Sequence, residues 1–318
     1  MTATVRVALL GHGIGSSLSP ALHMEEAHRL GLDYEYRTVD LRDAPRADLG
    51  AQLSRLEEQG YVATNVTHPF KRSVLGHVDS LSPAVRRIGA ANLVLLGRAR
   101  GRRSRTAHNT DGTGFRGALE RFLAGRPAGG RVVQVGAGGA GLATVSALVD
   151  MGFEQVVVHD VAPAAVAAVL DRFGPLAPGR LRGTGGSLED WLPRADGVVH
   201  ATPVGMVGHP GVALDVDRLA AGAWVAEVVY RPLETALVRR ARARGLATLD
   251  GGAMAVGQAA DSLRLITGLE PDLGRMRAHF ARLVADDGAH DDGAHDDGAH
   301  DDSAHEGPTT GRVRPGEE

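Results

Sequence analysis

Apolar and polar positions along residues 5–66 predict strands that alternate with helices. Three short runs rich in apolar and β-branched side chains predict strands at residues 5–10, 34–39 and 61–66. Between these runs, helices are predicted from Pro20 to about Leu30 and around Leu49, Leu53 and Leu56, where leucines recur at helical spacing. A strand, helix, strand, helix, strand order is typical of a parallel sheet.

The second half of the chain repeats this organisation. A β-hairpin is predicted through residues 99–106, and a helix is expected from about Gly112. Further strands are then predicted at residues 131–135, 155–160, 197–202, 224–230 and 246–250. Two helices follow, one through Met254, Gln258 and Leu263 and one through Met276, Phe280 and Leu283. The pattern predicts an α/β protein with two doubly wound domains.

The last 33 residues have a different character, because DDGAH occurs three times from Asp286 and is followed by DDSAH. A five-residue period fits neither a helix nor a strand, and no large apolar side chain is present to offset the entropy of ordering. We therefore expect residues 286–318 to be a disordered tail. Its histidines could hold divalent metal loosely; these are His290, His295, His300 and His305.

Composition and charge exclude several classes of protein. The chain has no Cys, which excludes disulfides, thiolate metal sites and Cys nucleophiles. No basic leader and no run of about 18 apolar residues is found, so we expect a soluble, cytoplasmic protein with no membrane association. The net charge of −3 combines −9 in residues 286–318 with +6 in the rest, which suits anionic small molecules without indicating nucleic acid.

A glycine-rich turn follows the predicted strand at residues 131–135. Gly136, Gly138 and Gly141 complete a G-x-G-x-x-G pattern, whereas the turn at Gly11, Gly13 and Gly15 does not. In the complete pattern the first Gly makes a tight turn, the second lets the backbone approach a pyrophosphate, and the third lets helix pack on strand. The helix N-terminus then faces the anion. A dinucleotide site is predicted here.

Asp160 ends the next strand, 24 residues after Gly136, where an acid would accept hydrogen bonds from the adenosine ribose. A 2′-phosphate about 4 Å from this carboxylate would be repelled by about 4 kcal/mol at an effective dielectric of about 20. No Arg follows directly, because residues 161–165 are uncharged and Arg172 is the next basic residue. The sequence favours NAD over NADP.

The chain's only Lys is Lys71, against 34 Arg, and it ends the segment NVTHPFK after a predicted strand. Unlike Arg, Lys can release and regain a proton at usable pH, so it can serve in acid–base chemistry. Asp111, in HNTDGTGF, could pair with it. The alternatives are that Lys71 is a solvated surface residue and that Asp111 only caps a helix. Ser19, before Pro20, could likewise be only an N-cap.

Eight motifs in one order identify a family. They are SLSP from Ser17, NVTHPFK, Ala91-Asn92, HNTDGTGF, VGAGGAG, ATPVGM from Ala201, VVYRPLET, and DGGAMAVGQAADSLRLITG. Over about residues 5–285 the chain resembles the shikimate dehydrogenases, and among them the NAD-preferring quinate/shikimate dehydrogenases. The resemblance implies reversible oxidation of shikimate or quinate, a cyclic hydroxy acid, at its C3 hydroxyl, by a monomer or homodimer. An amino-substituted analogue remains an alternative substrate, and metal buffering by the tail an alternative function of another class.

The resemblance also assigns residues and domains. It implies a catalytic pair, Lys71 and Asp111, and no metal. Residues that would hold the substrate are Ser17, Ser19, Thr67, Asn92, Tyr230 and Gln258, although Gln258 could instead be an exposed helix amide. Residues that would hold the cofactor are Gly136, Gly138, Gly139, Ala140, Asp160, Thr202, Pro203, Met206, Val228 and Gly251. The substrate-binding domain would comprise residues 1–111 plus 252–285, with the C-terminal helices returning to it, and the NAD-binding Rossmann domain residues 112–251.

Two residues depart from the pattern of this family. Leu93 stands where a Thr is common, which would remove a hydroxyl from the edge of the substrate cleft. Glu227 replaces a usual Asp before VVY. Both departures leave the choice between shikimate and quinate open.

Overall fold

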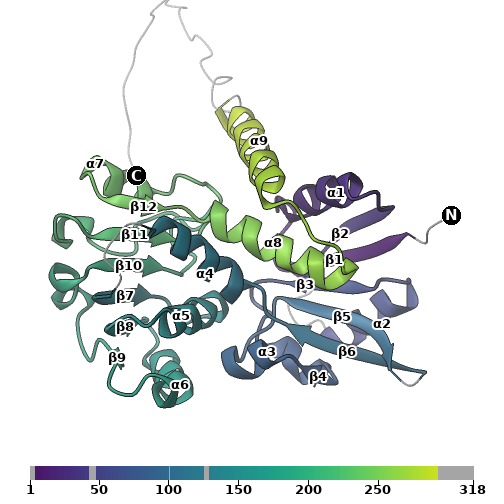
Figure 1. The fold of residues 1–318 in the computed structure, drawn as a ribbon, viewed down its shortest axis with the longest axis horizontal. Coiled ribbons are helices and arrows are strands. Elements are labelled where there is room, and N and C mark those ends of the chain that lie inside the picture. Colours follow the sequence, from purple (N-terminus) through teal and green to yellow (C-terminus); the bar gives the residue numbers. More distant parts are fainter. Residues whose placement is uncertain (1–3, 43–47, 100, 125–128, 293–318) are drawn as a thin grey trace, which may run out of the picture.

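The structure is a computed structural model that describes residues 4–42, 48–99, 101–124 and 129–292. Two α/β domains lie side by side, each built on a six-stranded sheet, and helices α4 (Asp111–Phe122) and α8 (Gly252–Thr267) run between them (Figure 1). This arrangement confirms the predicted fold class. No helix within the described residues is long and apolar enough to cross a membrane.

The first sheet has the strand order β2-β1-β3-β5-β6-β4. Its strands are β1 (Val5–Gly11), β2 (Tyr34–Asp40), β3 (Ala63–Val66), β4 (Ser80–Leu81), β5 (Leu93–Ala99) and β6 (Arg102–His108). β1 is parallel to β2 and β3, whereas β5 is antiparallel to β3 and β6. The predicted hairpin is therefore present and joins the parallel part of the sheet. The helical segments of this part of the chain are α1 (Ser19–Arg29), α2 (Leu49–Glu58), η1 (Ser73–His77) and α3 (Pro83–Ile88).

The second sheet is entirely parallel and has the order β12-β11-β10-β7-β8-β9. Its strands are β7 (Arg131–Val135), β8 (Gln155–His159), β9 (Leu181–Gly183), β10 (Gly197–His200), β11 (Trp224–Glu227) and β12 (Ala247–Leu249). Its helices are α5 (Gly139–Met151), α6 (Pro163–Phe173) and α7 (Ala236–Ala243), with short turns η2 (Gly174–Leu176), η3 (Leu188–Asp190), η4 (Leu192–Arg194) and η5 (Val216–Arg218). The strand order reverses direction between β7 and β10, which is where such sheets bind ligands.

Two glycines set how closely the helices between the domains approach. A Cβ on Gly114 of α4 would lie 2.6 Å from the backbone N of Gln258, and one on Gly257 would lie 3.0 Å from the Cα of Gly114. Only residues without side chains permit this crossing of α4 and α8. Because the two helices cross closely, Gln258 of α8 lies near the start of α4, where Asp111 is located.

The C-terminal helices return to the first domain, as expected. Met276 and Phe280 of α9 (Leu273–Asp292) pack with Leu22 of α1 in one apolar cluster. In addition, the buried Glu26 of α1 accepts a hydrogen bond from Arg275 Nε at 2.7 Å. α9 continues through Asp292, so the prediction of disorder from Asp286 is wrong for residues 286–292. Once a helix is nucleated, each further residue adds at little cost. Residues 293–318 of the predicted tail lie outside the described residues.

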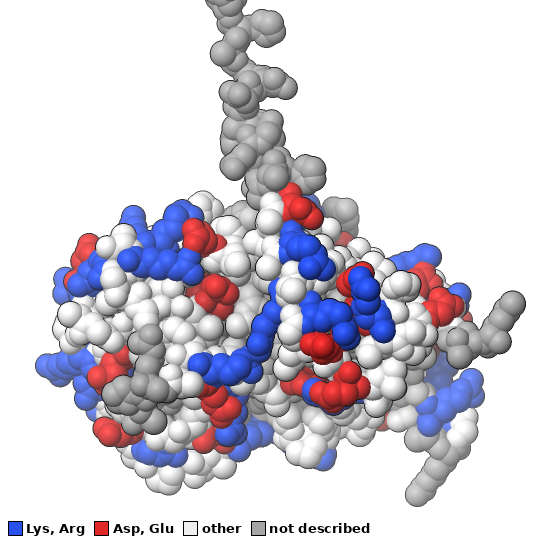
Figure 2. Space-filling view, turned by 45° about the horizontal axis from the view of Figure 1, so that its top comes forward, with Lys and Arg blue, Asp and Glu red and all other residues white. Residues whose placement is uncertain are grey.

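Charged side chains of both signs lie next to one another on the surface. Figure 2 shows Lys and Arg interspersed with Asp and Glu on the face that it presents. Arg264 is one example, because its guanidinium donates to Glu270 at 2.6 Å and also to Asp261. Exposed pairs of this kind add little to stability, commonly about 0–1 kcal/mol each.

A buried histidine makes the free energy of unfolding depend on pH. His23 of α1 is fully buried against Tyr34 and Tyr36, its Nε2 has no hydrogen-bond partner among the described residues, and burial lowers its pKa from 6.5 to about 3. Below about pH 6.5 the unfolded chain binds a proton at this residue that the folded chain does not. Acidification from about pH 6.5 to about 4.5 should therefore remove about 2 kcal/mol of stability through this group alone.

Urea unfolding at both pH values in the native chain and in His23→Phe measures this contribution. In the native chain the free energy of unfolding should fall by about 2 kcal/mol between the two pH values through His23, and in the variant this part of the fall should be absent, since Phe does not titrate. Parallel pH profiles for the two proteins would show that His23 titrates normally in the folded state. Exposed His28, on the same helix, provides the matched control through His28→Phe, which should leave the pH dependence unchanged.

Candidate active site

Lys71 and Asp111 form an ion pair where the two domains meet. Lys71 follows β3, Asp111 is the first residue of α4, and Lys71 Nζ lies 2.6 Å from Asp111 Oδ2. Their side chains are 17% and 6% exposed, respectively. The alternatives considered above are therefore wrong: Lys71 is not a solvated surface residue, and Asp111 does not act as an N-cap. Thr110 has the N-cap position of α4 and makes no side-chain capping bond.

A network of amide and hydroxyl groups surrounds this pair. Asn92 Nδ2 lies 3.0 Å from Asp111 Oδ1 and 3.3 Å from Gln258 Oε1. Thr110 Oγ1 is 2.8 Å from the same Asn92 nitrogen and 3.0 Å from Ser262 Oγ. The predicted residues Asn92 and Gln258 are thus brought together beside the ion pair, and Gln258 is not an exposed amide.

Three members of this network were not assigned from the sequence. Thr110 and Ser262 connect α4 to α8, and Asn65 Nδ2 donates to Asn92 O at 3.1 Å and to Ser262 Oγ at 3.2 Å. All three lie inside quoted motifs, but Asn65 and Ser262 are 197 positions apart in the sequence. A buried amide needs hydrogen-bond partners, and only this general requirement could have suggested from the sequence that Asn65, Thr110 and Ser262 belong to the network.

The first glycine turn lies beside the segment that contains Lys71. A Cβ on Gly11 would lie 2.4 Å from Thr67 Cγ2, so the ends of β1 and β3 are in contact there. Ser17 and Ser19 are half-buried at the start of α1. The predicted N-cap role of Ser19 is wrong, because Leu18 has the N-cap position and Ser19 begins the helix. Ser17 Oγ instead accepts from the Ser19 N–H at 3.3 Å.

Tyr230 joins this group of residues from the second domain. Its ring is half-buried, lies 6.2 Å from the ring of Phe280, and packs in the cluster that includes Leu18. Leu18, which lies between Ser17 and Ser19, thus packs in the same cluster as Tyr230. Tyr230 therefore lies near the two serines that, like it, are candidates for binding the substrate.

The three glycines of the second turn occupy three different environments. Gly136 has φ of +108°, and a Cβ there would lie 2.6 Å from Ala201 O. A Cβ on Gly141 would lie 2.4 Å from Gly136 O, so helix α5 packs directly on the strand end. In the described part of the chain, no atom beyond the adjacent residues lies within 4 Å of a Cβ on Gly138, which leaves its backbone open at the N-terminus of α5. An open backbone at a helix N-terminus fits a pyrophosphate.

The same turn touches the catalytic candidate. A Cβ on Gly139 would lie 3.2 Å from Lys71 Cβ and 3.3 Å from its Cδ. Ala140 follows Gly139 in the first turn of α5 and is half-buried. The glycine-rich turn of one domain is therefore in contact with the Lys71 side chain of the other. A dinucleotide bound along this turn would extend beside the ion pair.

Asp160 stands at the end of β8 and organises the turn. Its Oδ2 accepts from the Ala137 N–H at 2.7 Å, and its Oδ1 accepts from the Ala162 N–H at 2.9 Å. The carboxylate therefore lies directly beside the glycine-rich turn. It remains half-buried, so it retains lone pairs for the hydroxyls of a ribose.

The remaining cofactor candidates follow β10 and β11. Thr202 comes just after β10, where Val204 N–H donates to its Oγ1 at 3.2 Å, and Pro203 and Met206 are exposed in the same loop. Gly251 packs against the loop that follows β11, since a Cβ on Gly251 would lie 2.5 Å from Val228 O. These residues follow the carboxyl ends of β10 and β11, and Thr202 lies beside the glycine-rich turn, since a Cβ on Gly136 would lie 2.9 Å from Thr202 Cγ2.

Glu227 and His200 form a buried hydrogen-bonded pair behind the loop that contains Thr202, and the sequence did not indicate this pairing. Glu227 Oε1 lies 2.8 Å from His200 Nδ1, and the other ring nitrogen of His200 is hydrogen-bonded to Thr202 Oγ1. Both side chains of the pair are at most 1% exposed. Glu227, which departs from the family pattern, therefore holds in place, through His200, the loop that contains the cofactor candidate Thr202. The expectation for Leu93 is corrected too, because Leu93 is fully buried with Val7 and Leu9 in the core and not at the cleft edge.

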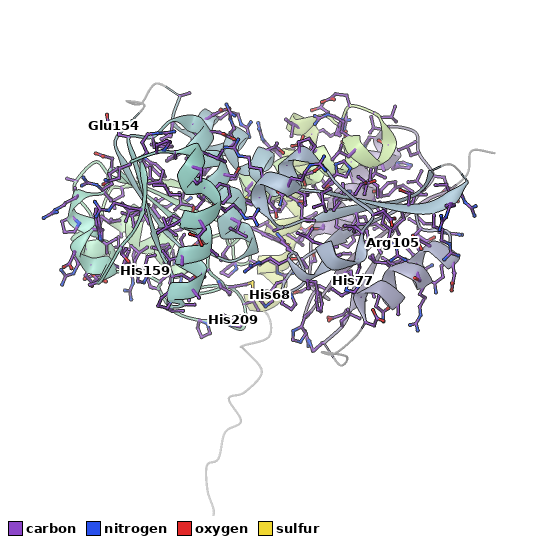
Figure 3. All side chains as sticks on the ribbon, turned by 90° about the horizontal axis from the view of Figure 1, so that it is seen from below. His68, His77, Arg105, Glu154, His159 and His209 are labelled. Atoms are coloured by element: carbon purple, nitrogen blue, oxygen red, sulfur yellow. The ribbon has the colours of Figure 1, made fainter. Side chains whose placement is uncertain are left out.

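Histidines from both domains face the same region. His68, next to Pro69 in the Lys71 segment, and His209, in the loop after β10, lie near one another between the domains (Figure 3). Burial lowers the pKa of His68, and the nearby charges of His12, His209 and Lys71 lower it further. A neutral His68 keeps additional positive charge away from Lys71. Within the described residues, no three His, Asp or Glu side chains are grouped to hold a metal ion.

Comparisons with known proteins agree with this geometry. Residues 9–94 match the family described as the shikimate dehydrogenase substrate binding domain. The chain is 49% identical to a shikimate dehydrogenase (NADP(+)) of Streptomyces avermitilis, over 87% of this chain and 95% of that protein. It is 43% identical to a quinate/shikimate dehydrogenase (NAD(+)) of Corynebacterium efficiens, over 88% of this chain and 99% of that protein.

Two solved structures share the whole two-domain fold. Quinate dehydrogenase from Corynebacterium glutamicum in complex with NAD superposes with a TM-score of 0.79 at 39% identity, covering 88% of this chain and 99% of that one. Shikimate 5-dehydrogenase from Thermus thermophilus in complex with NADP(H) and shikimate gives 0.75 at 35% identity, with the same coverage. The chain belongs to the shikimate dehydrogenase family.

Proposed function

We propose that this protein is a dehydrogenase that reversibly oxidises shikimate or quinate at the C3 hydroxyl to the 3-dehydro ketone, with NAD preferred to NADP. The observation that supports this most strongly is the Lys71–Asp111 pair, 2.6 Å apart, against the glycine-rich turn at Gly139. An acid–base pair and a dinucleotide site in contact are what hydride transfer from an alcohol requires.

The proposed mechanism uses the ion pair to handle the proton. A nicotinamide dinucleotide supplies the hydride acceptor when it is bound. Lys71 and Asp111 hold the substrate hydroxyl, and Lys71 in its neutral amine form takes the hydroxyl proton as the carbonyl forms, becoming the ammonium; in the reverse direction the ammonium returns this proton to the alkoxide oxygen. Asn92, which donates toward Asp111 Oδ1 at 3.0 Å, fixes the carboxylate so that its other oxygen faces Lys71.

The substrate is held by polar groups of the first domain. In our proposal the hydroxyls of Ser17 and Ser19 bind the carboxylate, and Thr67, Asn92 and Gln258 bind the ring hydroxyls. Tyr230, from the second domain, would contact the substrate from the other side. This assignment is supported by the contact of Gly11 with Thr67 and by the 3.3 Å approach of Asn92 to Gln258.

The cofactor preference is proposed from Asp160. The relatives divide, because the 49% identical protein is named for NADP(+) and the 43% identical one for NAD(+). What favours NAD is local: a carboxylate that also holds the Ala137 N–H stands where a 2′-phosphate would have to fit. Gly136, Gly138, Gly139 and Ala140 would receive the pyrophosphate.

Steady-state kinetics with each acid and each cofactor test this proposal. We expect kcat/KM for NAD to exceed that for NADP by about tenfold or more, since one third of the estimated repulsion already corresponds to tenfold. Asp160→Asn should reduce this ratio toward one by removing the charge. Asp217→Asn, which changes an exposed acid of the same domain, should leave it unchanged. A preference for NADP in the native chain would contradict the assignment of Asp160.

A further inference from the structure

A cavity separate from the Lys71–Asp111 pair lies between the domains, on the side of α3, α5 and α6. Its volume is about 490 Å³, which is within the usual range for small-ligand sites. Four of its lining residues are arginines, namely Arg72, Arg86, Arg87 and Arg172, and its one lining acid is Asp171. We call this cavity the interdomain basic pocket. Nothing in the proposed reaction uses it.

Two of these arginines are already engaged across the domain interface. Arg172 Nη1 of α6 donates to the carbonyl oxygens of Arg86 at 3.1 Å and Arg87 at 3.4 Å, at the C-terminal end of α3. Arg87 forms an ion pair with Asp150 of α5. Together these contacts tie α3 to the second domain and gather positive charge at the interface.

The other two arginines have unused donors. Within the described part of the chain, the side chains of Arg72 and Arg86 make no hydrogen bond or ion pair, and both residues are exposed. Asp171 is not within ion-pair distance of either. Two unpaired guanidinium groups thus line the pocket, and its four arginines outnumber its one acid. A cavity with an excess of one sign of charge concentrates ions of the other sign.

We propose that the interdomain basic pocket binds an anion of the phosphate class. The planar guanidinium presents parallel N–H donors that match phosphate oxygens, and such charge-assisted hydrogen bonds are strong. Ala137 and Leu142 give the pocket a partly apolar wall beside these donors. Because both domains contribute arginines, a bound anion holds the domains in the arrangement seen here.

The pocket borders the dinucleotide site but is not the same site. Ala137 lines the pocket, and its N–H is held by Asp160, so the two sites share one corner. The open backbone at Gly138 does not line the pocket. A phosphate could therefore arrive free from solution or as the 2′-phosphate of NADP. The experiment below distinguishes these two sources.

Calorimetric titration of inorganic pyrophosphate into the full chain saturated with NADH tests for a free anion. NADH occupies the glycine-rich turn, so binding that persists reports the pocket. Arg86→Ala should weaken this binding about tenfold or more by removing one guanidinium, and Arg86→Lys should restore part of it. Arg55→Ala, an exposed arginine on α2 of the same domain, is the matched control and should change nothing.

The second arm compares NAD and NADP affinities of the same variants. If Arg86→Ala weakens NADP binding about tenfold or more and leaves NAD binding unchanged, the pocket holds a cofactor phosphate. If pyrophosphate binds the NADH complex and the variant weakens it, the pocket holds a free anion. The proposal is overturned if pyrophosphate does not bind the NADH complex and Arg86→Ala leaves NADP binding unchanged, or if Arg86→Ala and Arg55→Ala behave alike in both arms. Neither result depends on which cyclic acid is oxidised.

Discussion

Replacing Lys71 with Arg is expected to lower kcat by about 10²–10⁴-fold while both substrates still bind. Arg keeps the positive charge beside Asp111, 2.6 Å away in the native pair, but it cannot release a proton at usable pH. The variant therefore separates the charge of Lys71 from its proton chemistry. Turnover of shikimate and quinate, followed by NADH absorbance, gives kcat, and quenching of protein fluorescence gives cofactor binding.

A double-mutant cycle with Asp111→Asn sharpens this test. If Lys71 and Asp111 act as one unit, the double variant should be about as slow as the slower single variant, because residues that act together are not additive. Independent roles would instead multiply the two losses. Arg55→Lys, at an exposed position, controls for the exchange of Arg and Lys elsewhere. Near-normal kcat in Lys71→Arg would remove Lys71 from the proton transfer.

Most strands were predictable from sequence, because buried parallel strands carry continuous apolar runs, whereas their order within each sheet was not predicted. β7, β8 and β10 are almost fully buried and were all expected. β4 and β9 were not predicted, since they contain two and three residues and leave no recognisable period. Short strands depend on their neighbours in the sheet, and those neighbours are fixed only by the tertiary fold.

The candidate site was predictable where a motif fixes its chemistry. Lys71, Asp111 and the three glycines fall where the motifs imply, because turns, strand ends and helix starts fix those positions locally. The hydrogen-bond partners were not predictable. Gln258 reaches Asn92 only because Gly114 and Gly257 let two helices cross closely, and packing between distant segments leaves no periodic trace in the sequence.

The helix start at Ser19 and the tail show errors of a different kind. Ser before Pro is a frequent N-cap, yet here Leu18 is already in a helical conformation and the helix begins one residue early. At the other end, a repeat with no apolar side chains was expected to be disordered from Asp286. α9 nevertheless extends to Asp292, since packing of Met276 and Phe280 forms the preceding turns. In both cases tertiary context outweighed a local preference.

Removing the carboxylate of Glu227 should lower the free energy of unfolding by about 3–5 kcal/mol. Glu227 is fully buried and accepts from Val228 N–H at 2.8 Å, Val229 N–H at 2.9 Å and Thr235 Oγ1 at 3.0 Å, in addition to its contact with His200. Glu227→Ala removes the acceptor of the Val229 N–H, the Thr235 hydroxyl and His200 Nδ1 in a buried site, whereas the Val228 N–H keeps its bond to His200 O at 3.0 Å. Each buried donor left without an acceptor is costly.

Urea unfolding of Glu227→Ala and of Glu234→Ala measures this loss against a control. Glu234 is an exposed acid seven positions later that pairs with Arg242, so its removal should cost less than about 1 kcal/mol. Equal stabilities of the two variants would show that the buried network is not what holds β11 to its neighbours. Glu227→Gln keeps the size and one acceptor oxygen, and we expect it to retain most of the stability. Because His200 also bonds Thr202, Glu227→Gln should raise KM for NAD more than it lowers kcat, which a purely structural role would not produce.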